Sequence, residues 1–123
     1  MAKKMTEQEI EKLAYEIRNF LLRKNLWMDV TIYFNGKAIS TDDRDGHHAY
    51  NDPTKVFVLE NQDPKKYFEY AGGVLSMSFD GELYEVLNYC TRPNVVDGFW
   101  KLLEKHGLHY ELGNAWNLSV YPN

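Results

Sequence analysis

The densest group of potential metal ligands in the sequence is the stretch TDDRDGHHAYND, residues 41–52. It holds four aspartates and two adjacent histidines, which are residue types that bind calcium or transition metals. If Gly46 is the sixth position of an EF-hand loop, Asp43 and Asp45 take the third and fifth positions. The first position is then Thr41, and the twelfth is an aspartate in place of the bidentate glutamate. Residues 41–52 therefore do not match the calcium-binding motif of an EF-hand.

The two histidines of this stretch are equally poor as a pair of ligands. His47 and His48 are adjacent, so in an extended segment their side chains point in opposite directions. A transition-metal site would need Asp43, Asp45 or the distant His106 and His109 to converge on them. We therefore expect no metal and no cofactor, and interpret residues 41–52 as a long exposed loop available to a protein partner.

Cys90 is the only cysteine and raises the possibility of a nucleophile, with His106 and His109 downstream as bases. The surrounding NYCTRP matches no signature of cysteine hydrolases or phosphatases, so we expect a small buried hydrophobic residue at a strand end. Gly72 and Gly73 lack the Lys-Ser or Lys-Thr pair of a P-loop. The sequence therefore assigns no catalytic residue.

Composition narrows the classes of partner. The 123 residues carry 14 Lys and Arg against 18 Asp and Glu, a formal charge of −4, so no basic field exists to attract nucleic acid. No apolar segment approaches the ~20 residues of a membrane span, and the first twelve residues lack the apolar region of a leader. A single cysteine agrees with a reducing compartment. We expect an acidic, cytoplasmic protein.

Two amphipathic helices are indicated. Thr6 and Glu9 have capping-box spacing, and the helix that they begin is expected to end near Asn25. Its apolar stripe comprises Ile10, Leu13, Ile17, Phe20 and Leu21, and its solvated face Glu7, Glu11, Lys12, Arg18 and Arg23. The second helix is expected to begin at Asn94 and stop at Gly107, with Val96, Phe99, Trp100 and Leu103 as its apolar side.

Three hairpins and a single strand complete the expected fold. Asn35-Gly36 predicts a hairpin in which Ile32 faces Ile39 and Tyr33 faces Ala38. Asp80-Gly81 predicts a second hairpin, with Leu75, Met77 and Phe79 on the same face as Tyr84 and Val86. KVFVLE predicts a further strand, and DPKKYFEY a loop or one short helix started by Pro64. The order α-ββ-β-ββ-α-ββ gives one α+β domain over 1–123, a two-layer sandwich of a mostly antiparallel sheet under two helices.

The last hairpin supplies the second group of candidate binding residues. A three-residue loop through Ala115 pairs Leu112 with Trp116 and so gathers the large apolar side chains on one face. The other face then presents a mixed polar and aromatic row: His109, Glu111, Asn117, Ser119 and Tyr121. If the sheet is uncovered on that side, the row extends to Ser76, Ser78, Glu85 and Tyr33.

The function that these observations favour is a small, non-enzymatic interaction or accessory module, for example an inhibitor-like factor, that binds another protein or a second copy of itself. It would use the open sheet face or residues 41–52. The alternative is a small-ligand binder or an enzyme with a pocket between sheet and helix, built on His106, His109 and Glu111 with Cys90 or the loop aspartates as helpers. Binding of single-stranded nucleic acid ranks third.

Overall fold

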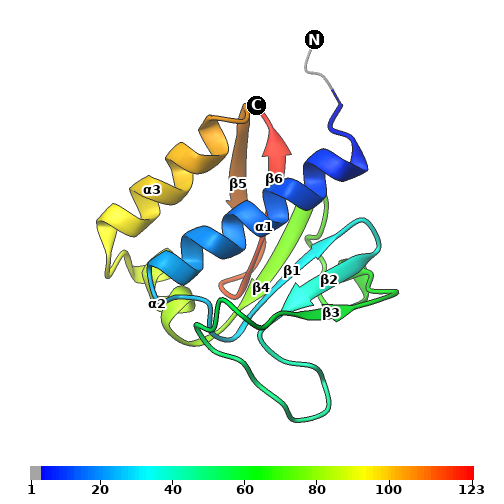
Figure 1. Ribbon diagram of the computed structural model, residues 1–123. Coiled ribbons are helices and arrows are strands. Elements are labelled where there is room, and N and C mark those ends of the chain that lie inside the picture. The colour runs from blue at the N-terminus through cyan, green and yellow to red at the C-terminus, as the bar shows by residue number, and fades with distance from the viewer. Residues whose placement is uncertain (1–3) are drawn as a thin grey trace.

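The computed structural model describes residues 4–123, which form a six-stranded antiparallel sheet with three helices on one of its faces (Figure 1). The predicted α+β class, an antiparallel sheet under a helical layer, is confirmed. None of the helices in this part of the chain is both long and apolar enough to cross a bilayer. The helices are α1 (Glu7–Arg23), α2 (Gly81–Tyr89) and α3 (Pro93–Glu104). The strands, in the sheet order β3-β2-β1-β4-β6-β5, are β3 (Phe57–Leu59), β2 (Lys37–Ser40), β1 (Val30–Phe34), β4 (Leu75–Phe79), β6 (Asn117–Pro122) and β5 (Leu108–Leu112).

Helix α1 begins and ends where the sequence predicts. Thr6 Oγ1 accepts a hydrogen bond from the Glu9 amide at 3.1 Å, and the Glu9 carboxylate accepts one from the Thr6 amide at 2.9 Å, which completes the capping box. Asn25 has φ of 57° and follows the helix end in the left-handed conformation. The expectation for Arg18 is wrong, because its side chain is buried against Trp27 rather than solvated.

The first hairpin is confirmed in its register. Ile32 pairs with Ile39 and Tyr33 with Ala38, and both Asn35 and Gly36 have the positive φ that the turn requires. The predicted strand after the loop is β3, which pairs with β2 as an edge strand. Of the loop or short helix expected from Pro64, the structure has a single turn of 3₁₀ helix, η1 (Pro64–Lys66).

The predicted second hairpin is wrong beyond Asp80. Residues 81–89 form α2, so β4 has no partner that follows it directly in the chain. It pairs instead with β1 on one side and β6 on the other, at Met77 with Ile32 and Leu118. Asp80 is extended, with φ of −133°, whereas the predicted turn needs positive φ at both central residues. Leu83 and Val86, one helical turn apart, are buried in the core.

The last two strands form a hairpin with the predicted faces but a different register. Leu112 pairs with Leu118 and Tyr110 with Val120, so the loop is two residues longer than expected. A shift of two residues keeps the alternation, and Leu108, Tyr110, Leu118 and Val120 all lie in the core. Leu112 and Trp116 do not, since they are 43% and 39% exposed. In α3, Trp100 is likewise 38% exposed, and the buried face is Val95, Phe99, Leu102 and Leu103.

The second face of the sheet is partly covered, contrary to expectation. Residues 60–73 cross it, and Phe68 packs there against Tyr33 and Ala38 in a small second core. The Ser119 hydroxyl donates to the Tyr70 carbonyl and accepts from the Gly72 amide, and it contacts the Ser76 hydroxyl at 2.8 Å. These buried hydroxyls attach the covering segment to the sheet. Grooves open on either side of this covering segment.

Candidate functional site

Residues 41–52 form an internally bonded loop. The Asp43 carboxylate accepts hydrogen bonds from the amides of Asp45 and His47 at 2.8 Å and 3.0 Å, and lies 2.6 Å from His47 Nδ1. Burial raises the pKa of Asp43, but these hydrogen bonds outweigh it and hold the pKa below its ordinary value. The carboxylate is therefore engaged in shaping the loop, while the side chains of Asp45, His47 and His48 are exposed at its surface.

The base of the loop is joined to Asp29, the residue just before β1. Asp42 and His48 form an isolated antiparallel bridge, and the Tyr50 hydroxyl donates to Asp29 Oδ1 at 2.7 Å. That hydrogen bond raises the pKa of Tyr50. His48 Nδ1 also lies 3.2 Å from the Tyr50 hydroxyl. Asp29 and Asp42 are thereby held at the same edge of the second sheet face.

A groove of about 300 Å³ opens at this edge, between the loop and the segment that covers the sheet. We call it the acidic groove, after three carboxylates in its lining. It is lined by Asp29, Val30, Thr31, Tyr33, Thr41, Asp42, Arg44, Tyr67, Ser78, Phe79, Asp80 and Trp116. The lining contains three carboxylates and one guanidinium, and two of its four aromatic side chains, those of Tyr67 and Trp116, are exposed. The acidic groove thus unites the loop with the sheet face, the two surfaces singled out from the sequence.

Arg44 connects the two walls of the acidic groove. Its guanidinium donates to the Tyr33 hydroxyl at 3.2 Å and lies 5.8 Å from the centre of the Tyr67 ring. The Arg44 amide donates to Asp42 Oδ1 at 2.6 Å. The single cation of the groove is therefore already engaged with aromatic side chains.

The five candidate residues of the last hairpin separate into two sets. Asn117 and Ser119 are buried, at 0% and 1% exposure, beneath the covering segment. His109, Glu111 and Tyr121 lie nearer the free edge: His109 Nε2 is 2.8 Å from Glu111 Oε2, and its ring centroid is 6.0 Å from that of Tyr121. His109 Nδ1 also lies 2.8 Å from Asn123 Oδ1. Only this second set is accessible to a partner.

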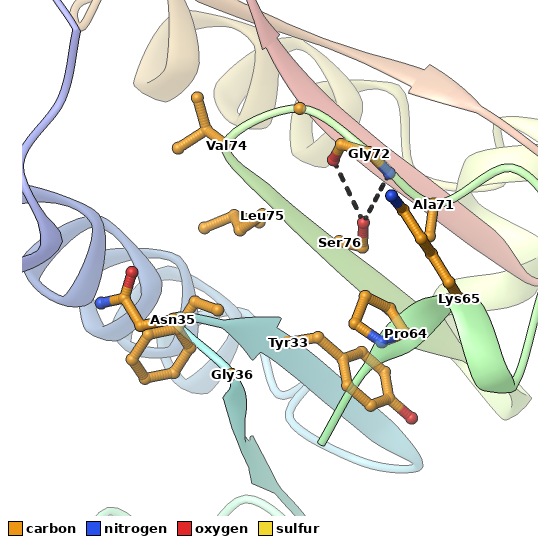
Figure 2. Close-up of a pocket in the computed structure, with 12 residues that line it drawn as sticks. Tyr33, Asn35, Gly36, Pro64, Lys65, Ala71, Gly72, Val74, Leu75 and Ser76 are labelled. Carbon is orange, nitrogen blue, oxygen red and sulfur yellow. Dashed lines mark hydrogen bonds between the residues drawn. The ribbon is translucent and has the colours of Figure 1, made fainter. Parts of the chain in front are cut away.

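A second groove, of about 290 Å³, opens at the other end of the covering segment. Figure 2 shows Tyr33 and Gly36 from the first hairpin on one side of it, and Lys65 and Gly72 from the covering segment on the other. The Ser76 hydroxyl accepts a hydrogen bond from the Gly72 amide at 3.4 Å and donates to the Gly72 carbonyl at 3.3 Å. Lys65 is the only charged residue among those that line this groove, so it offers fewer groups for recognising a partner than the acidic groove does.

The residues considered for catalysis lie apart. His106 Nε2 contacts Glu16 Oε1 of α1 at 2.8 Å in the helical layer, whereas His109 and Glu111 lie on the opposite face of the sheet. Cys90, expected to be buried at a strand end, is exposed at the end of α2 with φ of 53°. Across residues 4–123, no three His, Cys, Asp or Glu side chains are grouped so that they could hold a metal ion.

Sequence reasoning missed most of the acidic groove. Asp29, Asp80 and Tyr67 belong to three segments that no local pattern connects, and Trp116 was assigned to the core. The sequence did contain one indication of these lining residues. Asp42 and Arg44 lie in the same loop as the candidates Asp43 and Asp45, and they are likewise two positions apart. No family model, curated protein or solved structure matches this chain.

Proposed function

We propose that the protein is an interaction module that binds a basic segment of another protein in the acidic groove. The observation that carries this proposal is the composition of the groove wall, where three carboxylates and two exposed aromatic side chains surround one cavity. Carboxylates attract and orient lysine and arginine, and aromatic residues supply most of the contact energy in protein interfaces.

The carboxylates are available to a partner. Asp80 occupies the position before α2, yet its side chain makes no capping hydrogen bond, and no ion pair with it occurs within residues 4–123. Asp29 accepts one hydrogen bond, from the Tyr50 hydroxyl, and so keeps acceptor capacity. With Arg44 as the only cation among the lining residues, the groove keeps an excess of two negative charges. A lysine or arginine of a partner would complement that excess.

The aromatic side chains are exposed but fixed in place. Tyr67 is 50% and Trp116 39% exposed. Tyr67 packs against Tyr33 with ring centroids 5.8 Å apart, and Trp116 packs edge-on against Phe68 at 5.6 Å. Rings that are already ordered lose little conformational entropy when a partner covers them. They are the residues we expect to contribute most to the affinity.

The loop that forms one wall is also ordered before binding. Asn51 Oδ1 accepts from the Trp27 amide at 2.9 Å, and the Asn51 amide donates to the Trp27 carbonyl at 2.8 Å. Arg18 donates to three carbonyls just beyond, those of Asp52, Pro53 and Lys55. These bonds hold the C-terminal end of the loop, and the Thr41 amide, which donates to the Val30 carbonyl of β1 at 3.1 Å, holds its N-terminal end. Such an ordered loop favours binding without a large rearrangement.

The test is a charge-neutralised variant with unchanged shape. Asp29→Asn, Asp42→Asn and Asp80→Asn together keep the acceptor oxygens used by Tyr50 and by the Arg44 amide, but remove three negative charges. We expect the wild-type chain to bind arginine- and lysine-rich peptides in a fluorescence titration, with an affinity that falls as salt rises, and the variant to bind at least tenfold more weakly. Partners captured from the source cells should be lost by the same variant.

The matched control removes three carboxylates elsewhere on the surface. Glu69→Gln, Glu82→Gln and Glu85→Gln change exposed residues outside the groove lining. This control should bind basic peptides almost as well as the wild type. Equal losses in both variants would mean that net charge, and not the groove, attracts the peptides. A wild-type chain that binds basic and acidic peptides alike would refute the proposal.

A further inference from the structure

Strand β5 is an edge strand whose outer side is unpaired. The amide of Asn123 donates to the Gly107 carbonyl, and the amide of Gly113 donates to the Asn117 carbonyl, on either side of β5. In an antiparallel pair the hydrogen-bonded residues alternate, so the odd-numbered residues of β5 bond to β6. The backbone groups of Leu108, Tyr110 and Leu112 therefore point away from the sheet. Within the described chain no other strand reaches them.

The two edges of the sheet differ in their protection. The opposite edge strand, β3, has only three residues, and short edges resist further pairing. Strand β5 has five residues, LHYEL, with neither proline nor lysine to discourage an added strand. Figure 1 shows β5 at the border of the sheet, with α3 beside it. A groove of about 340 Å³ lies against this edge, lined by Trp100 and Glu104 of α3 and by Leu108, His109 and Asn123.

Large apolar side chains are exposed beside the same edge. Trp100 stacks on Tyr110 with ring centroids 4.3 Å apart, yet is 38% exposed. Leu112, at the end of β5, is 43% exposed. On the other side of the sheet, His109 and Glu111 present an imidazole and a carboxylate. The edge thus combines unpaired backbone, apolar surface and one group of each charge type.

We propose that β5 pairs antiparallel with β5 of a second copy of this chain, centred on Tyr110, so that two sheets join into one. This register sets Leu108 opposite the second copy's Leu112, and His109 opposite its Glu111. Because the outward-pointing residues are even-numbered, Tyr110 faces its own counterpart as a hydrogen-bonded pair. His109 and Glu111 then form non-hydrogen-bonded pairs, in which opposing side chains approach most closely.

Charge selects this register over its neighbours. A shift by two residues in one direction sets His109 against His109, and in the other direction it sets Glu111 against Glu111. Only the register centred on Tyr110 sets a histidine opposite a glutamate. The two-fold symmetry of the dimer produces this pair twice. The hydrogen bonds to Glu111 and Asn123 raise the pKa of His109, which increases the fraction of charged imidazole near neutral pH. In the same register the exposed Leu112 lies opposite the second copy's Leu108, at the border of its core.

The experiment uses two variants with opposite charge changes. In Glu111→Lys, residues 109 and 111 are basic or neutral, and in His109→Glu both are acidic, so each variant alone opposes self-pairing. We expect sedimentation of the wild-type chain over a concentration series to show a dimer, and each variant to dimerise about tenfold more weakly. An equimolar mixture should restore the dimer, because each copy then faces unlike charges.

The mixture separates an interface from a change in the fold. Within each variant the contact between residues 109 and 111 is lost, so only pairing between copies can restore association. Glu82→Lys, an exposed charge reversal on α2, should dimerise like the wild type. A wild-type chain that stays monomeric at every concentration refutes the proposal, as does a mixture that remains monomeric while both variants show wild-type unfolding curves. Failure would leave the acidic groove untouched, because the edge of β5 does not line it.

Discussion

The guanidinium of Arg18 lies over the indole of Trp27, with its central carbon 5.8 Å from the ring centroid. Both residues are buried; Trp27 also bonds to Asn51 at the end of the 41–52 loop, and Arg18 bonds to the residues just after it. Arg18 Nη2 donates to the carbonyls of Pro53 and Lys55 at 3.4 Å and 3.1 Å, and Trp27 exchanges hydrogen bonds with Asn51. One buried cation therefore links α1, the start of β1 and the loop that forms a wall of the acidic groove.

The first prediction concerns this link. We expect Arg18→Met to lower the free energy of unfolding by about 2–4 kcal/mol, because the carbonyls of residues 52, 53 and 55 lose a buried, charged donor while the aliphatic volume is largely kept. Urea unfolding followed by tryptophan fluorescence measures the change. Hydrogen exchange should also accelerate at residues 51–55. Arg23→Met, at an exposed position of the same helix, should change stability by no more than about 0.5 kcal/mol. Equal effects of the two substitutions would contradict the role given to Arg18.

The second prediction concerns the protonation of His109. Hydrogen bonding to Glu111 first, and to Asn123 second, holds the pKa of His109 above its ordinary value of 6.5. The folded chain therefore binds this proton more tightly than the unfolded chain does. The resulting stabilisation is complete below the ordinary pKa and is lost as pH rises through the raised pKa of the folded state.

Proton NMR of the imidazole tests the direction of the pKa shift of His109. We expect the His109 resonance of the wild-type chain to titrate with a midpoint above 6.5, and Glu111→Gln to move that midpoint down. Glu82→Gln, on a helix at the other face, should leave it unchanged. The titration is done at protein concentrations where sedimentation shows a single species. A wild-type midpoint at or below the ordinary value would rule out the hydrogen-bonding pattern around His109.

The third prediction concerns the tight approach of the covering segment to β6. Gly73 has φ of +67°, and a Cβ there would overlap the carbonyl oxygen of Val120. Gly107 has nearly the same φ, +72°, but a Cβ there meets no atom within 4 Å. Gly107→Ala should therefore cost only the left-handed penalty of about 1 kcal/mol, while Gly73→Ala adds a steric cost of about 1–3 kcal/mol.

Thermal unfolding of the two variants gives this comparison directly, because the shared backbone penalty cancels in the difference. We expect Gly73→Ala to unfold at the lower temperature. It should also expose the aromatic residues of the covering segment, which near-ultraviolet circular dichroism reports. Variants of equal stability would show that residues 71–73 can move away from β6 without cost.

The parts of the fold that sequence predicted are those governed by local physics. The capping box at Thr6 and the turn at Asn35-Gly36 each depend on residues within four positions of one another, and both are present. Alternation along the last hairpin also placed Leu108, Tyr110, Leu118 and Val120 in the core, although the hairpin is shifted by two residues and Leu112 and Trp116 are exposed. A shift of two residues leaves each side chain of a strand on the same face of the sheet, so the faces of the strands could be predicted although the register could not.

The wrongly predicted hairpin at Asp80-Gly81 shows that short-range sequence patterns do not determine which strands pair. Tyr84 and Val86 alternate as in a strand, while Leu83 and Val86 have the three-residue spacing of a helix, so the segment fits both periods. What decides between them is that β4 already has two neighbours, β1 and β6, from distant parts of the chain. Pairing over such separations is not encoded in a short window. The segment therefore adopts its helical alternative and packs Leu83 in the core.

The acidic groove escaped prediction for the same reason. Asp29, Asp42, Asp80 and Trp116 are separated by up to 87 positions, and strand order alone brings them to one edge. The loop aspartates that composition did single out serve partly to shape the loop, as Asp43 does by accepting from two amides. Composition thus located the region of the site but not the groups that line it.

The last prediction concerns Cys90, which occupies the left-handed position after α2 with φ of 53° and ψ of 41°. Helices commonly end at such a residue, and glycine is favoured there because it has no Cβ to clash with the backbone. The thiol is exposed, so its removal sacrifices no buried contact. We therefore expect Cys90→Gly to raise the free energy of unfolding by about 0.5–1 kcal/mol. Urea denaturation under reducing conditions measures it.

Two controls separate backbone conformation from side-chain chemistry. Cys90→Ser removes the thiol but keeps a Cβ, and should leave stability almost unchanged. Thr91→Gly places the same flexible residue one position later, where φ is not positive, and should destabilise the chain. If Cys90→Gly is no more stable than Cys90→Ser, the left-handed backbone at residue 90 carries no strain. The end of α2 would then owe its position to the packing of Leu83 and Val86 alone.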